Sequence, residues 1–238
     1  MYDADNIIEV TRTAVSNIAR IDNAIDEALT PIKDYTDTIA DVVSPIRAIA
    51  GFYSLAKRRK FKSFLSAYAK KVNSGIPVEE IVQRIKPYLA NPKNIELIAE
   101  IIDSAINAKS VNCSTILGYF AGEILSESKE TEYKDFIVIN ALESLIDDDL
   151  DYFLRLYEHI PADKRYEKYR VCNMAEELYT LNLDIFRLEV TLEKLKNTHI
   201  VGFDIGGHGN VGNAWGSFLF NENTDYFYSI VKRSGVVI

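Results

Sequence analysis

Residues 14–49, AVSNIARIDNAIDEALTPIKDYTDTIADVVSPIRAI, form the most regular pattern in the chain. Apolar residues recur there at alternating spacings of three and four, which places them along one face of a helix. One row consists of isoleucines seven residues apart: Ile18, Ile25, Ile32, Ile39 and Ile46. Several such heptads in succession are typical of helices that pack lengthwise against another helix. The pattern predicts a helical N-terminal region with this isoleucine stripe as an assembly face.

Two similar breaks interrupt the stripe. Thr30-Pro31 and Ser44-Pro45 lie fourteen residues apart, and each pairs a helix-capping hydroxyl with a proline suited to the first helical position. We therefore expect three helical segments, 5–29, 31–43 and 45–73. The alternative is one helix that continues through the prolines with kinks.

The rest of the chain also reads as mostly helical. Apolar spacing and capping residues predict helices at 77–90, from 92 past Cys113 towards Leu125, at 133–146, after the acidic run at 147–149, at 164–181, at 184–197 and at 223–233. We expect an aspartate of the run 147–149 to cap the helix that follows, and Asn223 or Thr224 to cap the last one. Two stretches near the C-terminus, 199–205 and 214–220, predict strands.

The segment LEKLKNTHIV at 192–201 resembles the junction between recognition helix and wing in winged-helix domains. The resemblance covers about residues 149–238 and implies that 199–220 is a β-hairpin wing with a glycine-rich tip. The expected fold is therefore α+β and predominantly α-helical, a helical bundle with a C-terminal winged-helix-like domain. The expected domains are 1–74, 75–163 and 164–238.

A winged helix implies contact with either DNA or protein. The helix that would enter the major groove offers Arg187, Thr191 and Lys194 as candidate nucleic-acid contacts. Glu189 and Glu193 on the same helix oppose phosphate, and the whole chain carries a net charge of −8. These charges favour protein contact, with a DNA-binding regulator as the alternative.

One short segment is strongly basic. Its cations form a candidate basic patch: Lys57, Arg58, Arg59, Lys60, Lys62, Lys70 and Lys71. Apolar residues share the other face of the same predicted helix. Four interpretations remain open: a core-packed helix with a solvated basic face, an anionic membrane surface bound by residues 39–72, a nucleic acid, or an acidic protein partner.

Two glycine-rich matches are rejected by their position in the chain. GHGNVG at 207–212 fits a dinucleotide-binding spacing, and IVGFDIGG at 200–207 resembles the first phosphate loop of sugar kinases and actin-like ATPases. Both motifs open long α/β domains, but few residues follow them here. The trio His199, Asp204 and His208 matches no metal-ligand spacing. We expect no catalytic residues, cofactor or metal.

The sequence therefore predicts a non-enzymatic interaction or regulatory protein of bacterial type. It would assemble or dock through its N-terminal helices, with self-association or a protein partner as the expected contact. The alternatives are the DNA-binding regulator and a peripheral membrane effector. Two isolated cysteines, the lack of a basic leader and the lack of a long uncharged apolar run predict a cytoplasmic protein, with peripheral membrane attachment as an alternative.

Overall fold

The computed structural model describes residues 3–16, 55–73, 75–202 and 217–237. These residues are predominantly α-helical with one small antiparallel sheet, in agreement with the expected α+β class. The chain divides into two compact units, Met1–Glu132 and Tyr133–Ile238. The domain boundaries expected after residues 74 and 163 each fall inside one of these units.

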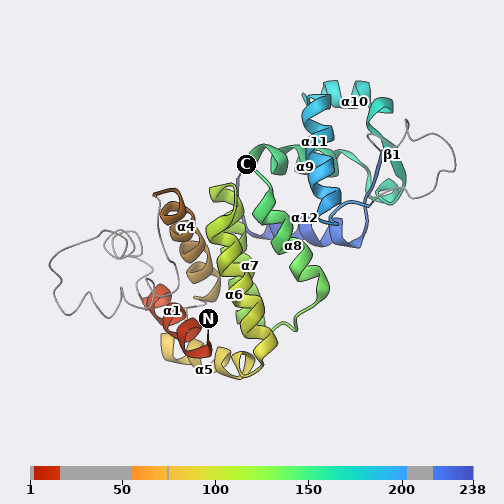
Figure 1. Cartoon of the computed structure of the whole chain (residues 1–238). Helices are drawn as coiled ribbons and strands as arrows, with labels where there is room; N and C mark the ends of the chain where they lie inside the picture. Colours follow the sequence, from red (N-terminus) through yellow and green to blue (C-terminus); the bar gives the residue numbers. More distant parts are fainter. Residues whose placement is uncertain (1–2, 17–54, 74, 203–216, 238) are drawn as a thin grey trace. The chain divides into compact units, whose positions relative to one another are not determined.

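The first unit consists of helices in its described part (Figure 1): α1 (Ala4–Ser16), α4 (Leu55–Val72), α5 (Val78–Leu89), α6 (Pro92–Asn107) and α7 (Val111–Glu127). The isoleucine stripe lies outside the described residues, as do most of the expected segments 5–29 and 31–43. A helix running from α6 past Cys113 was wrongly expected. Helix α6 ends at Asn107, with Ala108 as its C-cap. The Ser110 hydroxyl then caps α7 by accepting the Cys113 amide at 3.0 Å.

Helices α4 and α7 pack lengthwise at very short range. Small residues at every fourth position of α7, namely Ser114, Gly118 and Gly122, face α4. The Ser114 hydroxyl donates to the Lys60 carbonyl at 2.7 Å, and a β-carbon on Gly118 would lie only 2.2 Å from the Phe64 carbonyl oxygen. The two backbones therefore approach as closely as they do because these positions lack bulk.

The apolar face of α4 is part of the core of the first unit. Its side chains are almost fully buried: Phe61, Phe64, Leu65, Tyr68, Ala69 and Val72. Tyr68 reaches α1, where its hydroxyl and that of Thr11 form a hydrogen bond of 2.5 Å. Burial raises the pKa of the Tyr68 phenol above its ordinary value.

The second unit contains nine helices and strands in its described part: α8 (Tyr133–Ser144), α9 (Asp147–His159), η1 (Ala162–Lys164), β1 (Lys168–Arg170), η2 (Val171–Asn173), α10 (Ala175–Thr180), α11 (Ile185–Asn197), β2 (Ser217–Leu219) and α12 (Glu222–Arg233). Asn221 caps α12, because its side chain accepts the amides of Asn223 and Thr224. The expected caps, Asn223 and Thr224, are therefore two and three residues too late in the sequence, although Thr224 accepts the Asn221 amide in return.

The prediction of one helix at 164–181 is wrong, because strand β1 lies within this range. β1 pairs antiparallel with β2, and Tyr169 lies opposite Phe218 with the two rings stacked at 5.4 Å. Gly202 forms a bridge to Leu219, so β2 has a partner on each side. Pairing between residues about fifty positions apart thus overrides the local helical pattern.

The expected strands at 199–205 and 214–220 are only partly present. His199 has a positive φ of 62° and ends α11, so the first stretch contributes a single bridge at Gly202. The second contributes β2, Ser217–Leu219. Residues 203–216, which include His208 and most of the expected wing tip, lie outside the described part.

An aromatic cluster fixes the segment between α9 and β1. The Tyr157 hydroxyl donates to Asp225 of α12 at 2.5 Å, and Tyr166 donates to the same carboxylate. The Arg165 guanidinium lies 4.1 Å from the centre of the Tyr157 ring, and the ring of Tyr228 stacks on the same tyrosine. Burial and the bond to Asp225 raise the pKa of Tyr157.

Candidate functional site

The predicted basic patch lies on α4, but several of its cations form hydrogen bonds or ion pairs within the first unit. Lys60 donates to the Ala108 carbonyl at the end of α6, and Lys57 donates to Asn107. Lys71 pairs with Glu123 and Glu127 of α7. The remaining described side chains, Arg59, Lys62 and Lys70, range from half-buried to exposed, and the Arg58 side chain lies outside the description.

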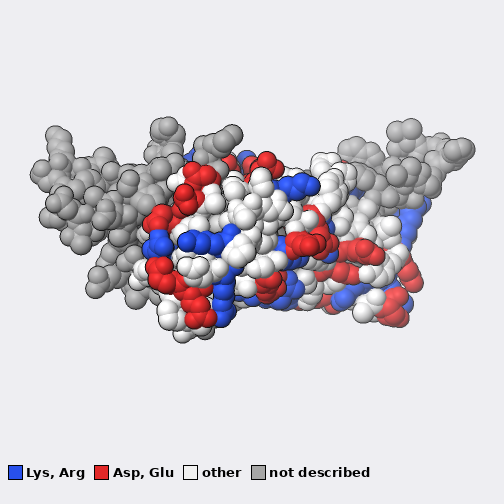
Figure 2. Space-filling model, turned by 90° about the horizontal axis from the view of Figure 1, so that it is seen from below, with Lys and Arg blue, Asp and Glu red and all other residues white. Residues whose placement is uncertain are grey.

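The electrostatics of α4 reflect these contacts. Burial, together with Lys57 and Lys109, lowers the pKa of Lys60. Burial opposes the charge on Lys71, but Tyr119, Glu123 and Glu127 outweigh it and raise its pKa. On the face shown in Figure 2, Lys and Arg side chains are interspersed with Asp and Glu side chains.

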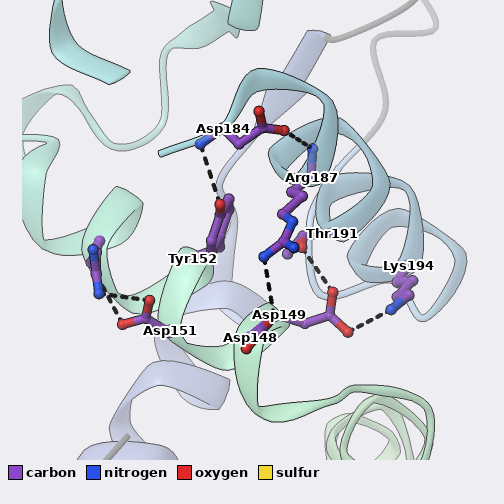
Figure 3. Close-up of polar contacts among 9 residues, drawn as sticks. Asp148, Asp149, Asp151, Tyr152, Asp184, Arg187, Thr191 and Lys194 are labelled. Atoms are coloured by element: carbon purple, nitrogen blue, oxygen red, sulfur yellow. Dashed lines mark hydrogen bonds and ion pairs between the residues drawn. The ribbon is translucent and has the colours of Figure 1, made fainter. Parts of the chain in front are cut away.

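A polar network joins the start of α9 to α11 (Figure 3). Asp149 is buried at its centre. One carboxylate oxygen accepts the Thr191 hydroxyl at 2.8 Å, and the other accepts the Lys194 ammonium at 2.6 Å. That second oxygen also accepts the backbone amide of Ile146 at 2.9 Å, which starts α9. An aspartate of the acidic run thus caps α9 as expected, although it does so from the third helical position.

A second set of contacts fixes the start of α11. The Asp184 side chain accepts the Arg187 amide at 2.9 Å, and the Asp184 amide donates to the Tyr152 hydroxyl at 3.2 Å. The Arg187 guanidinium reaches Asp148 at 3.4 Å in a largely exposed ion pair. Helix α11 is therefore held against α9 at both of its ends.

The candidate nucleic-acid contacts lie together on α11, but they face α9. Arg187 faces Asp148, whereas Thr191 and Lys194 face Asp149. Thr191 is only 3% exposed, so it has no surface for a base or a phosphate. Sequence alone could not reveal this, because it depends on which face of α11 meets the acidic start of α9.

The outward surface of this region is apolar. Phe186 is 75% exposed and Val190 is 56% exposed one turn later on α11, while Ile146 at the start of α9 is 41% exposed. Together with Tyr152 these three side chains line an open pocket of about 370 Å³, and Asp148, Asp149, Arg187, Thr191 and Lys194 complete its wall. We call this surface the α9–α11 groove.

The groove continues beyond Arg187. A second hollow of about 510 Å³ shares Tyr152 and Arg187 with the first and extends towards α10, where Tyr179 and Leu178 line it. Neither lining contains a histidine, cysteine or serine. The first hollow has mainly apolar walls with a polar rim, which fit the side chains of a bound ligand or protein.

Sequence reasoning missed Phe186, Val190 and Ile146. The apolar residues at helical spacing on α11 are Ile185, Leu188, Leu192 and Leu195, of which the three leucines are buried and Ile185 is exposed. The signal that could have found the groove is the second apolar pair, Phe186 and Val190, which lies four residues apart on another face of the same helix.

Comparison with protein-family models, curated proteins and solved structures gives no match for this chain. Among the described residues, no group of His, Cys, Asp and Glu side chains gathers in a way that could hold a metal ion. Within the same ranges, no helix has the length and hydropathy needed to cross a bilayer.

Proposed function

We propose that this chain is a non-enzymatic interaction protein that docks another protein chain in the α9–α11 groove. The observation that carries the proposal is the exposure of Phe186 and Val190 beside a pocket. Large apolar side chains gathered around a hollow are costly to leave in water and are typical of binding surfaces. Such pockets often hold the few side chains that dominate the energy of a protein interface.

A winged-helix-like arrangement of the second unit belongs to this proposal. The order β1, α10, α11, bridge at Gly202 and β2 supports it, because a helix pair with a four-residue turn precedes a pair of antiparallel segments. In this arrangement α11 takes the place of the recognition helix. Its outward face would then be the contact surface.

The composition of that face favours protein over DNA. Phe186 and Val190 point outward, and the cations Arg187 and Lys194 are already paired with aspartates. A DNA contact would have to separate these pairs before phosphates could be neutralised. The DNA-binding alternative therefore has less support than protein docking.

The membrane alternative has less support for a similar reason. Insertion of an amphipathic helix requires a free apolar face, but the apolar face of α4 lies in the core of the first unit. Residues 39–54 of the proposed membrane segment lie outside the described part. Assembly through the isoleucine stripe also stays a separate proposal, because those residues are not described.

The proposal can be tested with a photo-crosslinking amino acid. In the full-length chain expressed in its native host, p-benzoylphenylalanine replaces Phe186, and a matched variant replaces Tyr133, which is 77% exposed on α8. We expect protein adducts at position 186 that disappear when Val190→Asp is added. Identical adducts at both positions, or none at 186, would refute docking in the groove.

A further inference from the structure

We infer that the partner segment in the α9–α11 groove combines apolar anchor side chains with lysine or arginine on both sides of them. This inference rests on the proposed docking function and names the chemistry of its occupant. The apolar part follows from the groove itself. Phe186, Val190 and Ile146 present a strip with a pocket of about 370 Å³ that can hold an aliphatic or aromatic side chain.

The first acidic flank of the strip is the start of α9. Asp147, Asp148 and Asp149 lie in its first turn. The buried Asp149 accepts hydrogen bonds from Thr191 and Lys194. Within the described part of the chain, Asp148 pairs only with Arg187, at 3.4 Å, and both of these side chains are largely exposed. One buried carboxylate oxygen of Asp147 has no hydrogen-bond partner. This flank therefore retains negative charge after its internal pairs are counted.

The second acidic flank lies on the other side of the strip. Thr191 and Lys194 turn one side of α11 towards α9. At 100° per residue, Glu189 and Glu193 fall on the opposite side of the row formed by Phe186 and Val190. Glu193 accepts Lys196 at 2.9 Å and stays half exposed, and no ion pair involves Glu189 among the described residues.

The charge balance of the groove follows from these two flanks. Residues 146–152 and 184–194 contain seven carboxylates and two cations, Arg187 and Lys194, which pair with the aspartates of α9. Two further cations just outside these ranges, Arg155 and Lys196, pair with Asp151 and Glu193, so carboxylates still outnumber cations seven to four. A partner segment with acidic residues would be repelled by the carboxylates on either side of the groove. A segment with basic residues would be attracted by the same carboxylates, which would also orient it.

The test uses a random peptide library displayed against the full-length chain. We expect the enriched peptides to share large apolar residues with lysine or arginine within about one helical turn. The strongest peptide is then synthesised, and its affinity is measured by fluorescence anisotropy at low and high salt. Val190→Asp should abolish binding, and salt should weaken it.

The matched variants separate charge from shape. Glu189→Gln with Glu193→Gln should weaken peptide binding about tenfold and reduce its salt dependence. Glu96→Gln with Glu100→Gln is the control, because these two carboxylates have the same spacing on exposed positions of α6. This control should leave the affinity unchanged.

Three outcomes would overturn the inference. The first is a library with no binder sensitive to Val190→Asp, and the second is a set of groove binders without basic residues. The third is a chain that dimerises by light scattering and becomes monomeric with Val190→Asp, since a second copy would then be the occupant. Docking itself fails only if crosslinks at position 186 yield no specific protein adduct.

Discussion

Asp149 illustrates how one side chain can organise a site. Its buried carboxylate starts α9 through the Ile146 amide and holds α11 through Thr191 and Lys194. Its neighbour Asp148 has the same charge but a single, exposed partner. The two residues therefore form a natural pair for comparing buried and exposed charge in the same turn.

We predict that Asp149→Ala lowers the free energy of unfolding by about 2–4 kcal/mol, because it removes a helix cap and leaves Lys194 and Thr191 without their acceptor. Asp148→Ala should cost less than about 1 kcal/mol, as expected for an exposed ion pair. Urea denaturation of the two variants and the parent chain measures both values. Equal losses in the two variants would contradict the central role of Asp149.

At the scale of single residues, the sequence predicted which side chains cap helices better than it predicted which way side chains point. The acidic run was expected to start a helix, and it does so through Asp149. Arg187, Thr191 and Lys194 were expected as nucleic-acid contacts, but on α11 they face the aspartates of α9. The orientation of a helix about its axis depends on its tertiary neighbours, and the spacing of residues does not contain that information.

At the scale of elements, the pairing of α4 with α7 depends on the absence of side chains. The β-carbon of an alanine at position 118 would meet the backbone of Phe64 at 2.2 Å, whereas at position 122 the nearest atom is the β-carbon of Lys71 at 2.8 Å. Backbone atoms cannot move aside without shifting the whole helix. Gly118 is therefore the tighter of the two positions.

We predict that Gly118→Ala destabilises the chain by about 2 kcal/mol or more, because α4 and α7 must separate to admit the methyl group. In a helix without such contact the same change would stabilise by about 1 kcal/mol. The sign of the shift in the urea midpoint thus distinguishes the two cases. A stabilised Gly118→Ala variant would show that the helices do not pack at this distance.

Most elements could be predicted from local patterns, but not all. Helices at 77–90 and 184–197 agree with α5 and α11 to within a residue or so, because caps and apolar spacing are local signals. Strand β1 was missed, since its three residues are defined by pairing with β2 far along the chain. The groove was missed for the same reason: Ile146 and Phe186 meet only in the folded unit.

At the scale of the whole molecule, the two units differ in their surfaces. Among the described residues, every large apolar or aromatic side chain that is exposed belongs to the second unit. The described helices of the first unit bury theirs fully or in part, including the apolar face of α4. This contrast supports the proposal that the second unit provides a contact surface.

Each unit also contains a buried tyrosine with a raised pKa, Tyr68 in the first and Tyr157 in the second. An unfolded tyrosine loses its proton near its ordinary pKa of 10.0, whereas these two keep theirs in the folded chain. Above that pH the unfolded state binds fewer protons than the folded state, so the free energy of unfolding falls as pH rises.

We predict that Tyr68→Phe makes the free energy of unfolding of the first unit fall less steeply as pH rises above 10. At neutral pH the same change should lower the free energy of unfolding by about 1 kcal/mol, because the hydrogen bond to Thr11 is lost. Urea denaturation of the parent and the variant at neutral pH and at pH above 10 measures the difference. An equally steep alkaline decline in both chains would show that Tyr68 ionises without unfolding.

The shared oxygen of Asp149 has a consequence for how the groove behaves in time. A helix end ordinarily frays on its own, and packing with a neighbour loosens separately. Here the amide that begins α9 and the ammonium that anchors α11 bind the same oxygen atom, so fraying of α9 would displace the acceptor of Lys194. We therefore expect fraying of α9 and undocking of α11 to be coupled.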